Sequence, residues 1–286
     1  MADKSNKVKI FVGYYKPNKI FKSDVYQPIL TADTDWDDAA LIKDNSGINI
    51  AEKNKNYGEL SGHYWVWKNF IPKTDCEYIG FCHYRRFLDF NISPIESIPF
   101  KPVYEKDFKK RFKQYSEDKI LEFIENFDII LPVQMEFKSI LYSQYLKWHP
   151  KKDMNLALNI IRDIYPEYIE TTKEVMGSKK MYTCLNFIMK KELLEKYFEW
   201  IFSILEELEK RTNWLKYKEY LEIRTPAFIT ERFFNIWLAY NIKKYNLKIK
   251  TSSSLFIVGE DYGEVNPEIY FEKYNAIVDL MKQDKI

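Results

Sequence analysis

Two adjacent arginines follow a short apolar segment in the first third of the chain. Residues 77–90 read EYIGFCHYRRFLDF, and the apolar run leads directly into His83, Tyr84, Arg85 and Arg86. A guanidinium is planar and can clamp phosphate oxygens through several N–H donors, while adjacent aromatic rings can flank a base or a sugar. Alternatively, one arginine pairs with a buried carboxylate, such as Asp89 or Glu59, and braces the sheet. The pattern indicates a site for a small anion, with a structural role left open for one arginine and for His83.

Glu231 is the best candidate for a carboxylate that accepts a proton. It belongs to the segment TPAFITER at residues 225–232, where the threonine and proline mark the start of a helix. We expect Glu231 in the first turn of that helix, where the positive end of the helix dipole stabilises an ionised carboxylate. The alternatives are an ordinary helix-start glutamate and an ion pair with Arg224 or Arg232. The sequence leaves both open.

The sequence contains few motifs for other catalytic chemistries. The chain has three histidines (His63, His83 and His149), eight glycines, and no HExxH, GxxxxGK[ST], GxSxG or dinucleotide-type glycine motif. These absences argue against zinc proteases, P-loop enzymes, serine hydrolases and dinucleotide-binding enzymes. Asp33, Asp35 and Asp37 have the DxD spacing that can hold a divalent cation on a diphosphate, but they lie in an acidic segment soon after the first strand. We interpret them as solvated loop carboxylates and expect no metal site.

Composition excludes further classes. The 286 residues are 46% hydrophobic and 17% aromatic, which is typical of a folded globular protein. Forty-four Lys and Arg against 42 Asp and Glu leave a net charge of +2, too near balance for binding nucleic acid through bulk charge. The three cysteines lack a CxxC spacing, and no apolar stretch approaches the roughly 18 residues of a membrane span. We expect a cytoplasmic protein. The basic segment 101–113 is either a solvated face or a patch for phosphate or a membrane surface.

The candidate residues need elements to position them, and the hydrophobic periodicity predicts these elements. Strands are expected at 8–14, 77–82, 127–132 and 182–189, and helices at 56–70, 155–164, 193–211 and 228–245. Residues 24–47 are acidic and poor in periodicity, so we expect a loop there. Strands alternating with helices imply an α/β fold with a mainly parallel central sheet flanked by helices. Ligands collect at the carboxyl ends of such strands, which brings Tyr14, Tyr15 and Lys16 beside the segment that begins at His83.

Five blocks of sequence, in order, resemble a known family. They are KIFVGYYK (9–16), GINIAEKNKNYGELSGHYWVWKN (47–69), EYIGFCHYRRF (77–87), FIMKKELLEKYFEWIFSILEELE (187–209) and FITERFFNIW (228–237). Together they resemble the bacterial capsular and exopolysaccharide glycosyltransferases long catalogued as a domain of unknown function, which include galactofuranosyltransferases. The resemblance implies a GT-A-like nucleotide-sugar fold with a helical C-terminal part. It also implies a UDP-linked donor of a sugar such as galactofuranose or galactose.

The resemblance implies how the leaving group is handled. In typical GT-A enzymes the central strand ends in a DxD motif that holds a metal on the diphosphate. Here the segment His83 to Arg86 takes that place, so Arg85 and Arg86 would neutralise the diphosphate without a metal. The family's Glu-Arg pair falls on Glu231 and Arg232, which favours Glu231 as the catalytic base and places Arg232 on the acceptor side.

The resemblance also assigns binding residues. The family's Asn, Lys and Asn fall on Asn49, Lys53 and Asn54. The nucleotide or its phosphates would be contacted by Tyr14, Tyr15, Lys16, Lys53, Asn54, His83 and Tyr84. Trp148 and His149 could hold an acceptor sugar by stacking, or could form a solvent-facing turn. The chain departs from the family at Leu185-Asn186, where an Asn-Met pair is usual, so the role of that polar residue stays open.

We expect one glycosyltransferase domain over residues 1–286. Residues 7–135 would form the nucleotide-sugar-binding half, 136–250 the acceptor half with the long helices, and 251–286 a C-terminal extension. The implied partners are a nucleotide-sugar donor and a glycan acceptor, with no further cofactor. A lipid-linked acceptor would bring the protein to the inner face of the membrane; the oligomeric state is left open. The competing hypotheses are a non-catalytic nucleotide- or carbohydrate-binding protein and, disfavoured by the charge balance, an RNA-binding protein.

Overall fold

The main sheet is mixed but mostly parallel. The structure is a computed structural model that describes residues 7–31, 34–91, 99–212, 217 and 223–258. The main path of the sheet runs in the order β11 (Ile249–Ser252), β7 (Ile129–Pro132), β10 (Phe187–Lys190), β4 (Tyr78–His83), β1 (Val8–Tyr14), β2 (Tyr26–Leu30), β3 (Ile42–Lys43). Within this path β10 runs antiparallel to both of its neighbours and the other pairs are parallel. The α/β fold with a mainly parallel central sheet is confirmed.

A hairpin extends the sheet from the carboxyl end of β4. The chain turns through Tyr84 and Arg85 into β5 (Arg86–Leu88), and His83 and Arg86 form the cross-strand pair. β12 (Ser254–Val258) lies antiparallel to β5 and parallel to β6 (Phe100–Tyr104). Directly opposed residues on two strands project to the same face, so His83 and Arg86 share a face while Arg85 lies in the turn.

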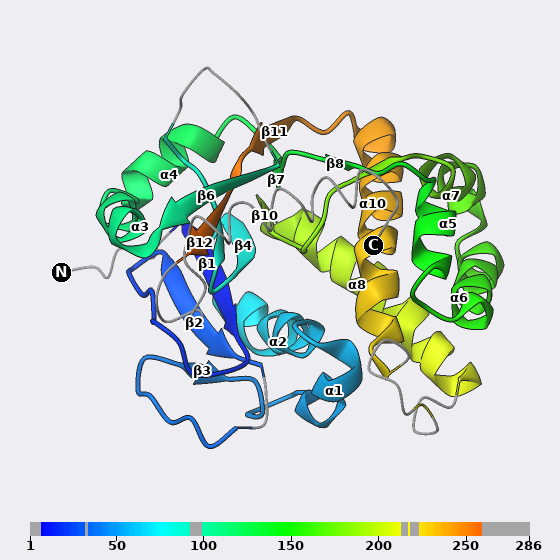
Figure 1. Ribbon diagram of the computed structural model, residues 1–286, viewed down its shortest axis with the longest axis horizontal. Coiled ribbons are helices and arrows are strands. Elements are labelled where there is room, and N and C mark those ends of the chain that lie inside the picture. Colours follow the sequence, from blue (N-terminus) through cyan, green and yellow to red (C-terminus); the bar gives the residue numbers. More distant parts are fainter. Residues whose placement is uncertain (1–6, 32–33, 92–98, 213–216, 218–222, 259–286) are drawn as a thin grey trace.

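Helices cover both faces of the sheet (Figure 1). One core packs Phe11, Phe81 and Phe187 against α2 (Leu60–Trp65), α6 (Lys151–Ile164), α8 (Lys191–Arg211) and α10 (Thr225–Tyr245). The other core packs Ile10 and Val12 against α3 (Glu105–Phe112) and α4 (Glu117–Ile124). Successive residues of β1 thus enter opposite cores, which explains why its sequence is apolar almost throughout.

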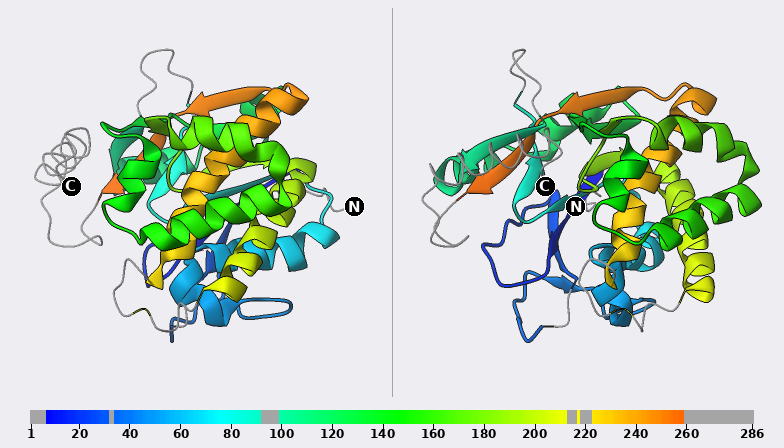
Figure 2. Two further views of the ribbon diagram at one scale, coloured as in Figure 1. Left: turned by 90° about the vertical axis from the view of Figure 1, so that its right-hand side faces the viewer. Right: turned by 45° about the vertical axis from the view of Figure 1, so that its right-hand side comes forward.

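The remaining elements are short. They are α1 (Asn54–Tyr57), α5 (Leu141–Leu146), α7 (Ile169–Met176), a π-helical turn (Val66–Phe70), 3-10 turns at Ala51–Lys53, Ile71–Lys73 and Pro166–Tyr168, and a two-stranded sheet of β8 (Met135–Glu136) and β9 (Lys180–Met181). Figure 2 shows that α5 to α8 and α10 gather on one side of the main sheet. Within the described residues, no helix is both long enough and apolar enough to cross a membrane.

The expected loop at 24–47 is wrong, because it contains β2 and β3. β2 pairs along β1, with Pro28 opposite Val12, and buries Tyr26 and Ile29. The sequence did not indicate this strand, because proline is rare in paired strands and the neighbouring residues are acidic.

Two other elements are shorter than expected. Of the strand predicted at 182–189, only Phe187 to Met189 belong to β10, because Cys184 and Leu185 have φ of 67° and 43° and turn the chain. The helix predicted at 56–70 is divided at Gly58, whose φ of 57° is left-handed. The helices predicted at 155–164, 193–211 and 228–245 all lie within longer helices, which confirms them.

The two expected halves share one sheet. β10, from the acceptor half, lies between β4 and β7 of the nucleotide half. The expected extension 251–286 begins inside the sheet, since β12 belongs to it, and residues 259–286 lie outside the described residues. The division at residue 135 stays a prediction.

Candidate active site

A cavity of about 500 Å³ lies at the carboxyl ends of β1 and β4. This is the edge of a parallel sheet at which ligands usually bind. Six of the site residues predicted from sequence line it: Tyr14, Tyr15, Asn54, His83, Arg86 and Glu231. The cavity is also lined by residues not predicted to bind ligand, including Gly58, Glu59, Cys184 and Arg224. The structure thus brings together residues from β1, α1, the β4–β5 hairpin and α10.

Glu231 faces the cavity from α10. The helix begins at Thr225, three residues earlier than expected, so Glu231 lies in its second turn and not in the first. Its Oε1 accepts a hydrogen bond of 2.8 Å from the backbone N–H of Cys184, and its Oε2 lies 3.2 Å from Arg232 Nη1. The side chain is 23% exposed. The carboxylate is therefore held in one orientation and remains accessible from the cavity.

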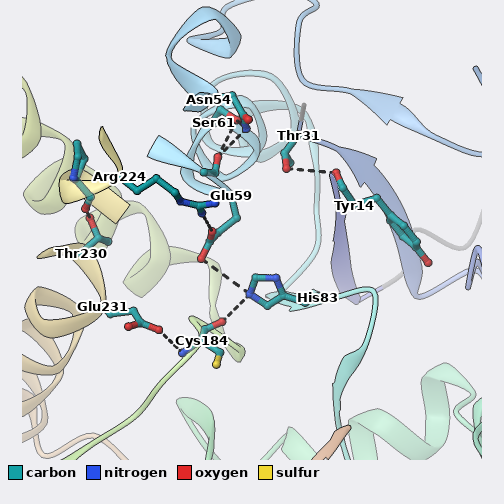
Figure 3. A network of polar contacts seen from close by, with 12 residues as sticks. Tyr14, Thr31, Asn54, Glu59, Ser61, His83, Cys184, Arg224, Thr230 and Glu231 are labelled. Atoms are coloured by element: carbon teal, nitrogen blue, oxygen red, sulfur yellow. Dashed lines mark hydrogen bonds and ion pairs between the residues drawn. The ribbon is translucent and has the colours of Figure 1, made fainter. Parts of the chain in front are cut away.

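The backbone of Cys184 connects Glu231 to His83 (Figure 3). Its N–H donates to Glu231, and its carbonyl lies 2.9 Å from His83 Nε2. A carbonyl can only accept, so His83 Nε2 carries the hydrogen. Left-handed backbone at a residue other than glycine is unfavourable and persists where the surroundings enforce it. Here two side chains on separate elements fix the turn between Cys184 and Leu185.

Glu59 lies between His83 and Arg224 (Figure 3). Its Oε1 is 3.9 Å from His83 Nε2 and its Oε2 is 3.8 Å from Arg224 Nη2. Burial would raise the pKa of Glu59, but His83, its own backbone N–H, His63 and Arg224 outweigh burial and hold the pKa below its ordinary value. Burial lowers the pKa of His83, with Glu59 opposing and Arg86 adding to the decrease. At neutral pH the cavity therefore contains an ionised Glu59 and a neutral His83 beside the guanidinium groups of Arg86 and Arg224.

Asn54 and the tyrosines shape the cavity through their own contacts. Asn54 Nδ2 donates to the carbonyl of Gly58 and to Ser61 Oγ, both at 2.9 Å, and so fixes the segment before Glu59. Tyr14 Oη donates to the Lys19 carbonyl, and the Tyr14 ring stacks on Tyr84 at 5.5 Å. Tyr15 is 53% exposed, and Tyr84 Oη donates to Tyr15 Oη at 3.3 Å. The side chain most open to a ligand in this aromatic group is Tyr15.

Arg85 and Lys53 are two of the four predicted cations that do not line the cavity; the other two are Lys16 and Arg232. The Arg85 guanidinium lies 5.4 Å from the centre of the Tyr84 ring and 5.5 Å from that of Phe256. Lys53 Nζ pairs with Glu209 at 2.8 Å and faces a separate cavity of about 350 Å³. Neither side chain lines the main cavity.

The remaining predicted site residues differ in how exposed they are. Lys16 is exposed, with its Nζ 5.6 Å from the centre of the Tyr15 ring. Arg232 is 4% exposed, donates to the Phe228 carbonyl and to Gln144 Oε1, and belongs to the packing between α10 and α5. Trp148 is 45% exposed. The His149 ring stacks on Phe228 at 4.0 Å, and Phe228 lines the cavity.

One of the ion pairs considered as alternatives, between Glu231 and Arg232, is present, and Asp89 has a different partner from those considered. Asp89 pairs with Arg111 at 3.0 Å. Arg224 pairs with Glu59, whereas Arg232 pairs with Glu231. Asp37 pairs with Lys43 at 3.0 Å, and Asp33 lies outside the described residues. Among the residues that the structure describes, no three or more His, Cys, Asp or Glu side chains come together as possible metal ligands.

Glu59 and Arg224 are the charged residues of the cavity that the sequence did not place in the site. Both were named only as ion-pair partners, since nothing in their spacing indicates a ligand. They are 165 positions apart and meet through the packing of α1 against α10. The sequence offered one signal, Gly58 next to Glu59. Glycine is enriched where the backbone is left-handed, so it indicates a special backbone conformation at this point.

Comparison with known proteins supports the family and the fold. No curated protein matches the chain. The solved structure titled "WbbM bifunctional glycosytransferase apo structure" is similar, with a TM-score of 0.77 and 29% identity over 88% of this chain. The chain spans 45% of that protein. The profile described as "Domain of unknown function (DUF4422)" matches residues 9–243, so the chain belongs to the DUF4422 family, as the sequence resemblance implied.

Proposed function

We propose that the chain is a glycosyltransferase that moves a sugar from a nucleotide-sugar donor to a hydroxyl of a glycan. The observation that carries this proposal is the cavity at the carboxyl ends of β1 and β4, where Arg86 and Glu231 enter from different elements. A guanidinium can hold a diphosphate and a carboxylate can accept a proton, and these are the two tasks of an inverting transfer. The similarity to a bifunctional glycosyltransferase supports the same reaction class.

The donor is proposed to be UDP-linked, with galactose or galactofuranose as the sugar. The exposed ring of Tyr15, held by the Tyr84 hydroxyl, borders the base or ribose, and Lys16 lies beside that ring. The neutral His83 donates its Nε2 hydrogen to the Cys184 carbonyl and thereby orients the turn that also holds Glu231.

The chemical step needs a base and a stabilised leaving group. The acceptor oxygen attacks the anomeric carbon, its proton passes to Glu231, and the electron pair of the broken C–O bond goes to the terminal phosphate oxygen of the leaving diphosphate. Arg86 stabilises the negative charge that develops on this oxygen. A preorganised cation in a cavity is most effective at stabilising charge that develops in the transition state.

The acceptor is proposed to enter beside Phe228. The stacked rings of His149 and Phe228 and the exposed Trp148 offer apolar faces on which a sugar ring can lie. A capsular or exopolysaccharide acceptor on a lipid would bring the protein to the inner face of the membrane. The basic segment 101–113 would then face the lipid, although Lys109 and Arg111 already pair with Glu105 and Asp89.

Replacement of Glu231 tests the proposal. Glu231→Gln keeps the hydrogen bond from Cys184 but cannot accept the proton, so we expect transfer to fall by roughly 10²- to 10⁴-fold while UDP affinity is retained. Glu199→Gln, an exposed glutamate on α8, is the matched control and should leave transfer unchanged. Unimpaired transfer by Glu231→Gln would contradict the base assignment. UDP binding by the wild type without transfer from any donor would favour a non-catalytic binding protein.

We also propose that the transfer needs no metal ion, because arginine side chains supply positive charge in the cavity. Transfer should therefore continue in excess EDTA at the rate measured with manganese. Loss of turnover in EDTA and its recovery on adding manganese would contradict this part of the proposal.

A further inference from the structure

Arg224 brings a second guanidinium to the cavity, from a part of the chain far from the arginine pair at 85–86. It is the residue directly before α10, and it lines the cavity with Arg86 and Glu59. Its side chain is 29% exposed. Arg85, expected from the sequence to be the second cation, does not line the cavity. The second positive charge at this site therefore comes from Arg224.

Gly58 makes room for the Arg224 guanidinium. A Cβ atom at position 58 would lie 2.5 Å from Arg224 Nη2, and the φ of Gly58 is +57°, a conformation that glycine adopts readily and other residues do not. Asn56 Nδ2 donates to the carbonyl of Ile223 at 2.8 Å and ties the residue before Arg224 to α1. The backbone on both sides of the guanidinium is thus fixed, and the guanidinium occupies the space a side chain would take.

The contact between Arg224 and Glu59 is a long ion pair. The 3.8 Å between Arg224 Nη2 and Glu59 Oε2 exceeds hydrogen-bonding distance. Phosphate oxygens can accept two parallel hydrogen bonds from a guanidinium, which gives a stronger interaction than this longer ion pair. A diphosphate that enters the cavity can therefore take Arg224 from Glu59 without breaking a hydrogen bond between them.

We propose that Arg224, together with Arg86, binds the leaving diphosphate of the donor, and that Glu59 holds Arg224 before the donor binds. This inference rests on the proposed function. As the C–O bond breaks, the diphosphate gains negative charge and Arg224 stabilises it, so the residue acts on the transition state as well as on donor binding.

The test compares ligands that differ in phosphate. The affinities of UDP, UMP and uridine are measured by calorimetry for the wild type, Arg224→Ala, Arg224→Lys and Gly58→Ala. We expect Arg224→Ala to weaken UDP by roughly 10- to 100-fold, which is the range for hydrogen bonds to charged groups, and to leave uridine unchanged. Arg224→Lys should lie between, since lysine cannot bind in a bidentate manner. Gly58→Ala should also weaken UDP binding and leave uridine binding unchanged. Arg162→Ala, an exposed arginine on α6, is the matched control.

A double-mutant cycle and steady-state kinetics would distinguish diphosphate binding by Arg224 from a merely structural role. Glu59→Gln removes the competing carboxylate and should tighten UDP binding several-fold, and this gain should disappear in the Arg224→Ala background. With a working donor, Arg224→Lys should lower kcat as well as raise the donor KM.

The outcomes separate this inference from the proposed function. Wild-type UDP affinity in Arg224→Ala and Arg224→Lys would overturn the inference and leave the proposed function standing. Equal losses for uridine and UDP would also overturn it, because they would show that Arg224 only shapes the fold. A wild-type protein that binds no nucleoside diphosphate would overturn the proposed function and this inference together.

Discussion

His63 is a buried histidine whose protonation should lower the free energy of unfolding. The side chain is 5% exposed, and its ring centre lies 4.0 Å from that of Phe81. Its Nδ1 has no hydrogen-bond partner among the described residues. Burial, opposed by Glu59 and assisted by His83, lowers the pKa of His63 to about 3. An unfolded chain binds the proton with a histidine pKa of about 6.5, so protonation favours unfolding.

The size of the effect follows from this difference in pKa. Because the folded-state pKa is the lower one, the stabilisation is complete above about pH 6.5 and is lost as the pH falls towards the folded-state value. One pKa unit corresponds to about 1.4 kcal/mol, so between pH 7 and pH 5 His63 alone removes about 2 kcal/mol from the free energy of unfolding. His63→Leu keeps an apolar side chain and removes the titrating group. Its free energy of unfolding should therefore fall by about 2 kcal/mol less than that of the wild type over this interval.

Urea unfolding at pH 5, 6 and 7, followed by tryptophan fluorescence, measures this difference. His83 and the carboxylates titrate in both proteins and largely cancel. Phe81→Leu is the matched control, because it disturbs the same part of the core without removing a titrating group. It should be less stable than the wild type at every pH but keep the wild-type pH dependence. Equal losses of stability in His63→Leu and the wild type would refute the reasoning.

Two further predictions concern the polar network around the cavity. Glu59→Gln should lower the pKa of His83 further, because the Glu59 carboxylate opposes the effect of burial; a ¹H–¹³C NMR titration of the histidine rings measures this, and an unchanged or higher pKa would contradict it. Cys184→Val should destabilise the protein by roughly 1–3 kcal/mol in urea unfolding, because a β-branched residue is disfavoured at the φ of 67°. Cys184→Gly should lose no stability, and similar stabilities for the two variants would show that the turn is not strained.

The arginine pair illustrates what a sequence motif leaves open. The apolar run before His83 indicated a buried strand with charged residues at its carboxyl end, and β4 ends there. The two-residue turn, however, places Arg86 across from His83 and leaves Arg85 beside the rings of Tyr84 and Phe256. Both guanidiniums lie near the centre of the Phe256 ring, at 5.5 and 5.7 Å, yet only Arg86 lines the cavity. A motif that names both arginines therefore does not say which one lines it.

The sequence by itself determined the class of fold, the long helices and the strands β1, β4 and β7, because the hydrophobic periodicity that encodes them is local. It also identified the family, through blocks in a fixed order. Tertiary structure alone decided that residues 26–30 form a strand, that Cys184 and Leu185 turn the chain, and that Arg224 lies beside Glu59. These features depend on contacts between residues far apart in the chain. Glu59 and Arg224 are charged residues of ordinary spacing, and only the packing of α1 against α10 brings them to one cavity.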